Sequence, residues 1–115
     1  MKLPEFGEVQ GPVLMLNMLK FNNREYYFET YLPAFRKVTE KLGINDVRVR
    51  LVCNVVANIL APENESWDAI ALVEYPSAQA FKTIAESDAY RDLADPHRLT
   101  ATANLHLYMT TPFEL

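Results

Sequence analysis

The sequence predicts an α+β fold in which a four-stranded antiparallel sheet carries two helices on one face. Its 115 residues suit one domain, residues 1–115, with chain enough for one hydrophobic core after an irregular lead-in over residues 1–12. Four runs have strand character, and two of them are apolar on both faces. Two helical stretches separate them, which gives the ferredoxin-like order of strand, helix, strand, strand, helix, strand.

The first strand is expected at residues 13–21, where apolar side chains are interrupted by Asn17. A helix should follow over residues 24–42, because one apolar stripe recurs there at helical spacing, namely Tyr27, Tyr31, Phe35, Val38 and Leu42. We interpret the aromatic residues of this stripe as core before a binding site. Pro33 lies inside this helix, so we expect a kink or a break just before it. Gly43 is typical of a helix C-terminal cap.

Residues 47–60 alternate in the manner of a second strand. One face is expected to join the core, and Cys53 on that face is therefore expected to be inert. The other face, which holds Arg48, Arg50 and Asn54, should form a partly polar surface or the wall of a cavity.

The third strand is the continuous apolar run at residues 69–73, which Pro76 ends and after which Ser77 caps a helix. Ser87 is expected to cap a second short helix that runs to about Asp95, where Pro96 follows. The last strand alternates between two sets of side chains. One set is Leu105, Leu107 and Met109, and the other is Asn104, His106, Tyr108 and Thr110.

The two strands that are apolar on both faces also predict an assembly. Helices cover only one face of such a sheet, and a monomer would expose a larger apolar patch on the other face than soluble monomers usually tolerate. Two sheets that pack face to face in a symmetric dimer would cover both patches. We therefore expect a homodimer whose sheets form a barrel around a cavity.

Composition excludes several classes of function. Eleven basic and fifteen acidic residues give a net charge of -4 without a Lys/Arg tract, so nucleic acid is not an expected partner. No apolar run is long enough for a membrane span. The start of the chain is not a signal peptide and there is one cysteine, so a reduced, cytoplasmic setting is expected. The two histidines and the cysteine match no metal-ligand spacing, and we expect no metal site.

Several segments together resemble an uncharacterised family of the dimeric α/β barrel superfamily, from residue 13 to about residue 110. The segments are Leu16-Asn-Met-Leu-Lys-Phe21, Trp67-Asp68, Glu74-Tyr-Pro-Ser77, Ser87-Asp-Ala-Tyr90 and His97-Arg98. The superfamily that the chain is similar to includes cofactor-independent monooxygenases, muconolactone isomerases, haem-dependent enzymes and stress-response proteins. The resemblance implies the dimeric barrel but selects no reaction.

Two groups of polar residues are candidates for a site. His106 and Tyr108 share a strand face and could move a proton, while Arg48, Arg50 and Asn54 could hold an anionic substrate. Alternatively, the arginines pair with nearby acids at the dimer seam, and His106 is an edge histidine whose hydrogen bonds are satisfied. Asn17 needs hydrogen-bond partners within its apolar strand, and these could be a cavity ligand, the partner chain or the neighbouring backbone.

Two hypotheses about function follow. The first is a small cytoplasmic homodimer that acts on a small organic molecule without a tightly bound cofactor, by an oxygenation or isomerisation that only the resemblance suggests. The second is a non-catalytic ligand-binding or stress-associated dimer. The sequence carries no glycine-rich phosphate loop and no nucleophile elbow, so nucleotide binding and serine hydrolysis are not expected.

Overall fold

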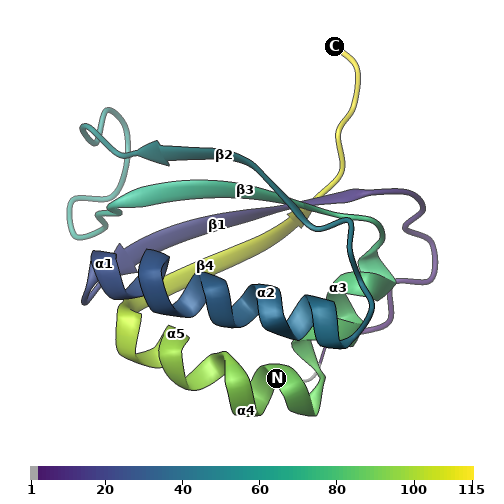
Figure 1. Cartoon of the computed structure of the whole chain (residues 1–115). Coiled ribbons are helices and arrows are strands. Elements are labelled where there is room, and N and C mark those ends of the chain that lie inside the picture. The colour runs from purple at the N-terminus through teal and green to yellow at the C-terminus, as the bar shows by residue number, and fades with distance from the viewer. Residues whose placement is uncertain (1–2) are drawn as a thin grey trace.

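A computed structural model describes residues 3–115, and it consists of two layers, a sheet and a group of helices on one of its faces (Figure 1). The sheet has four strands in the order β2-β3-β1-β4, and all neighbouring pairs are antiparallel. The strands are β1 (Val13–Phe21), β2 (Arg48–Asn54), β3 (Ala69–Tyr75) and β4 (Thr102–Thr110). The chain therefore has the predicted ferredoxin-like α+β fold.

The helices begin where the sequence places capping side chains. Asn23, Ser77 and Ser87 each accept a hydrogen bond from the backbone N–H three residues later. Gly43 has a φ of 71°, the left-handed conformation that ends a helix at little cost to glycine. The helical elements are α1 (Arg24–Tyr26), η1 (Tyr27–Tyr31), α2 (Leu32–Lys41), α3 (Ala78–Ala85), α4 (Asp88–Leu93) and α5 (Asp95–Ala101).

The segment before Pro33 is a π-helical turn rather than a break. In η1 the backbone is wound more widely, and the N–H of Leu32 donates to the carbonyl of Tyr27, five residues earlier. Pro33 then lies in the first turn of α2, where its missing N–H costs little. The stripe of Tyr27 and Tyr31 thereby continues into α2 without interruption.

The region after Asp95 differs from the prediction. Pro96 was expected to follow the last helix, but it lies in the first turn of α5, which extends to Ala101. The physical reason is that proline is disfavoured inside a helix but suits its first turn. His97 and Arg98 are therefore helical residues, and they do not lie beyond the helices as the sequence suggested.

Strand β2 is shorter than predicted and lies at the edge of the sheet. It ends at Asn54, and its pairing with β3 shifts between Val49 and Leu51. This irregularity reverses the alternation, so that Val49 faces the helices while Leu51 and Cys53 face the other way. The prediction that Cys53 and its neighbours belong to the core is wrong, because the shifted pairing turns Cys53 away from the helices and leaves it exposed.

The two faces of the sheet differ in what covers them. Val13, Met15 and Leu19 of β1 point toward the helices and are buried in the core. The alternate side chains form a second apolar surface, which we call the open face. Its apolar members are Leu14, Leu16, Met18, Leu51, Ile70 and Leu72. None of the helices formed by residues 3–115 has the length and apolar character needed to cross a membrane.

Candidate functional site

The helix-facing side of the sheet encloses a cavity with two adjoining lobes of about 130 and about 220 Å³. Both lobes are lined by Asn17, Tyr31, Phe35 and Tyr75, so these four side chains mark their common boundary. Apolar walls with a few polar groups are typical of small-molecule sites. The arrangement therefore makes this cavity the candidate site.

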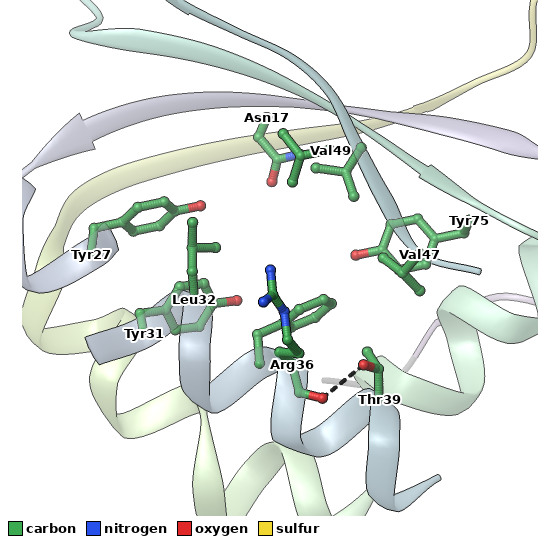
Figure 2. A pocket seen from close by; sticks show the side chains of 11 residues that line it. Asn17, Tyr27, Tyr31, Leu32, Arg36, Thr39, Val47, Val49 and Tyr75 are labelled. Carbon is green, nitrogen blue, oxygen red and sulfur yellow. Dashed lines mark hydrogen bonds between the residues drawn. The ribbon is translucent and has the colours of Figure 1, made fainter. Parts of the chain in front are cut away.

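Asn17 lies in the middle of β1, where its side chain enters the cavity from the sheet. The Nδ2 atom donates to the carbonyl oxygen of Met15 at 3.1 Å and, more weakly, to that of Ala71 at 3.5 Å. Figure 2 shows the amide oxygen turned toward the space between sheet and helices. The backbone thus holds the nitrogen, while the oxygen is free to accept a hydrogen bond from a ligand.

Tyrosines from both layers contribute hydroxyl groups to the cavity. In Figure 2 the Tyr27 and Tyr75 side chains approach from opposite ends, and their hydroxyls point toward each other across the space. The Tyr31 hydroxyl lies 2.9 Å from that of Tyr90. Burial raises the pKa of Tyr27 to about 12, and it also raises the pKa values of Tyr31, Tyr75 and Tyr90. All four side chains are therefore neutral at pH 7 and able to donate hydrogen bonds.

The charged residues of the two lobes differ in their partners. Arg36 projects from α2 into the smaller lobe, with its guanidinium group directed at the space below Asn17 (Figure 2). The larger lobe contains Asp95 and Arg98, whose Oδ1 and Nε atoms are 2.7 Å apart. The charge of Arg98 is therefore balanced within the protein.

Alkaline pH is expected to destabilise the fold through these tyrosines. Tyrosine side chains of the unfolded chain ionise near pH 10, whereas burial raises the pKa of Tyr27 in the folded chain to about 12. The stabilisation is complete below pH 10 and is lost as the pH rises from about 10 toward 12, because the unfolded state gives up protons first. The urea midpoint measured against pH should fall over this range.

A matched pair of variants tests the origin of this effect. Tyr75→Phe removes a buried hydroxyl and should make the fall shallower, whereas Tyr108→Phe removes one that is half exposed and should not. Equal profiles for the two variants would contradict the assignment to buried tyrosines.

His106 and Tyr108 lie on the open face and not in this cavity. His106 packs against Trp67, with ring centroids 4.5 Å apart, and its Nδ1 atom is buried without a hydrogen-bond partner in the described chain. The indole of Trp67 donates to Glu65 at 2.9 Å. The structure confirms that His106 and Tyr108 share a strand face, but it places them across the sheet from Asn17.

The predicted anion-binding residues do not gather around one space. Arg48 lies 4.0 Å from Asp46, and Arg50 pairs with Glu74 at 3.0 Å. Asn54 accepts a hydrogen bond from Arg24 at the other end of β2. These contacts match the alternative in which the arginines pair with nearby acids.

Sequence reasoning overlooked several residues of the cavity. Tyr27 and Tyr31 were interpreted as core, and they are indeed buried, but they also line the cavity. Arg36 and Tyr75 were not considered as site residues. The one available signal was the position of Arg36, one residue after Phe35 of the apolar stripe, at the border of the helix face that packs on the sheet.

Neither histidine belongs to a metal-binding group in the part of the chain that the structure describes. Residues 3–115 contain no cluster of three or more His, Cys, Asp or Glu side chains placed to hold a metal ion. His97 contacts the Tyr26 hydroxyl through Nδ1 at 2.6 Å. This contact ties α5 to the start of the first helical segment.

Comparisons with known proteins agree with this fold. No protein-family model matches the chain. No curated protein sequence matches it. A solved structure of a protein of unknown function from Rhodopseudomonas palustris is similar, with a TM-score of 0.76 and 26% identity over 95% of this chain and 88% of that chain.

Two more distant structures are also similar. An EthD family protein from Bacillus halodurans has a TM-score of 0.58 at 18% identity, over 90% of this chain and 100% of that chain. A DABB family protein with a ferredoxin-like fold from Mesorhizobium loti has a TM-score of 0.49 at 9% identity, over 91% of this chain and 100% of that chain. The likeness to the EthD family protein shows the fold alone.

Proposed function

We propose that this protein is a homodimer that binds a small organic molecule in the cavity between sheet and helices. One observation supports the binding site above all. The amide oxygen of Asn17, the hydroxyls of Tyr27 and Tyr75, and the guanidinium of Arg36 converge on one space from two layers of the fold (Figure 2). Polar groups directed into an apolar cavity fix the orientation of a ligand and select its chemistry.

The finer proposal is that the protein is an enzyme that needs no tightly bound cofactor. Neutral tyrosines that direct their hydroxyls into the cavity stabilise negative charge that develops on a ligand oxygen. An isomerisation or an oxygenation that proceeds through an enolate creates such a charge. Asp95, at the edge of the larger lobe, is the candidate proton acceptor for this step.

A non-catalytic ligand-binding function is the second candidate, and one contact favours it. The Asp95 carboxylate already forms an ion pair with Arg98 at 2.7 Å, so it must give up this contact before it can take a proton from a ligand. A protein that only binds its ligand needs no free base. Turnover of a bound ligand would distinguish the enzyme from the binding protein.

The homodimer is supported by the open face. Its apolar side chains lie on three neighbouring strands, and no helix of the described chain covers them (Figure 1). The C-terminal tail projects on this side, and exposed apolar residues occur in the tail, at Phe113, and in the loop after β2, at Ile59 and Leu60. A second copy that stacks its own open face here would bury the same surface twice.

An NMR titration with small aromatic ketones and phenols tests whether the cavity binds a ligand. Binding is measured from the changes in the amide chemical shifts. Wild-type protein should show shifts at Asn17, Tyr75 and Leu107, which line the two lobes. Tyr75→Phe removes one donor and should weaken binding by about threefold to tenfold, the value of one hydrogen bond.

Arg48→Ala is the matched control, because Arg48 is exposed and lies on the other side of the sheet. It should leave the affinity unchanged. Ligand shifts confined to His106 and Tyr108 would instead place the site on the open face and contradict the proposal.

A further inference from the structure

We infer that the ligand of the cavity is a small carboxylate with an aromatic or hydrocarbon body, and that Arg36 binds its carboxylate group. This inference rests on the proposed function, because it concerns the same cavity. It assigns a chemical class to the ligand and a recognition role to a residue that the sequence did not single out.

Arg36 carries a positive charge that no nearby carboxylate of the described chain neutralises. Within residues 3–115, Arg36 has no carboxylate within 4.0 Å, whereas Arg98 pairs with Asp95 and Arg91 pairs with Asp88 and Asp92. Its guanidinium group is directed into the smaller lobe (Figure 2), on the side of α2 where Arg36 is also open to solvent. The cavity therefore contains a cation whose charge the surrounding protein does not balance.

The polar groups that surround this cation are neutral. No acidic side chain lines the smaller lobe in the described chain, and its remaining polar groups are Asn17, Thr39 and the hydroxyls of three tyrosines. Neutral hydroxyls donate hydrogen bonds to an anion without repelling it. A planar carboxylate fits the fork of donors on an arginine, which can hold it through two parallel hydrogen bonds.

The larger lobe would hold the rest of the ligand. Its volume is about 220 Å³. A cavity of about 150 Å³ is large enough for benzene, so this lobe can hold a substituted ring. Apolar side chains from both layers line it, namely Phe81, Ile84, Ala85, Leu105 and Leu107.

The middle of the ligand would lie at the boundary that the two lobes share. A molecule that spans both lobes passes Asn17 and Tyr75, which line each of them. Its carboxylate would lie at Arg36 and its apolar body near Leu107. A polar group between the two ends would meet the Asn17 oxygen or the Tyr75 hydroxyl.

Phenylacetate and its neutral analogue phenylacetamide test the inference, with affinities measured by NMR titration of the amide signals of Tyr75 and Leu107. Wild-type protein should bind phenylacetate more tightly than phenylacetamide. Arg36→Met keeps an unbranched stem and removes the charged guanidinium group, so it should weaken phenylacetate binding by about 10-fold to 100-fold. The affinity for phenylacetamide should change by less than about twofold, since a neutral amide gains little from the charge.

Lys37→Met is the control, because Lys37 is the next residue of the same helix and lines neither lobe. It removes an equal charge and should leave both affinities unchanged. Arg36→Lys should retain part of the preference for phenylacetate, since it keeps the charge and loses the fork.

The possible results separate the two levels of the proposal. If Arg36→Met binds phenylacetate as tightly as wild-type protein does, or loses both ligands equally, the inference about carboxylates is overturned. Tighter binding of phenylacetamide in the same cavity would overturn it too, but would support the proposed function. If neither compound shifts the signals of Tyr75 and Leu107, both the inference and the cavity proposal fail.

Discussion

Leu16→Glu is expected to convert the proposed homodimer into a monomer. Leu16 is at the centre of the open face, opposite Leu72 in β3 and Tyr108 in β4. Two stacked sheets would bury this position in both protomers, and an unpaired buried charge costs about 3–5 kcal/mol. Because each 1.4 kcal/mol is a factor of ten in the dissociation constant, the variant should be monomeric at concentrations where the wild type is dimeric.

Size-exclusion chromatography with light scattering measures the change over a range of protein concentrations. Leu99→Glu provides the control, because Leu99 lies on α5 on the helix side and is 61% exposed. It should remain dimeric. Circular dichroism should show that both variants retain the fold, since the glutamate at position 16 faces water in a monomer. A monomeric wild type, or a dimeric Leu16→Glu variant, would contradict face-to-face packing.

Leu19→Ala is expected to lower the free energy of unfolding by about 2–5 kcal/mol, the usual loss for a buried leucine. Leu19 is 0% exposed on the central strand β1 and is among the largest fully buried side chains. It lies between Ala69 of β3 and Leu105 of β4, so little nearby volume can close the space that it leaves. A typical domain has 5–15 kcal/mol of stability, and the variant would lose a large part of it.

Urea unfolding gives the measurement, with wild type and variant at one protein concentration because a dimer gains stability with concentration. Leu99→Ala removes the same atoms from an exposed position and should change the free energy by about 0.5 kcal/mol or less. Similar losses in both variants would show that Leu19 is not in the tightly packed core.

Much of the fold could be predicted because local signals and tertiary contacts agree. The apolar character of residues 13–21 predicted the first strand, and β1 spans these residues. Ser77 and Ser87 were identified as caps because their hydroxyls satisfy backbone groups a few residues away. Such interactions need no knowledge of distant parts of the chain.

The prolines were harder to interpret, because a proline can either follow the end of a helix or lie in the first turn of the next one. The irregularity expected just before Pro33 takes the form of a π-helical turn, and Pro96 begins α5, although it was expected to follow the last helix. Whether a helix continues past a proline depends on the packing of both segments against the sheet. That packing is absent from the local pattern.

The candidate site was predicted only in part. Asn17 was identified because an amide in an apolar strand must find partners. His106 and Tyr108 were grouped correctly with each other, but the alternation of β2 misled the assignment of its faces. The irregularity between Val49 and Leu51 moves Cys53 to the open face, and no residue type in the sequence marks it.

The sequence by itself determined the four strands, their order and the capped starts of the helical segments between them, since hydrophobic periodicity and capping act over a few residues. Only the tertiary structure decided that Asn17, Arg36 and Tyr75 meet at one cavity. These residues come from β1, α2 and β3, and their approach depends on strand register and on the rotation of α2 against the sheet. Both are set by the packing of the whole core, because a side chain reaches the cavity only when every neighbouring layer is in place.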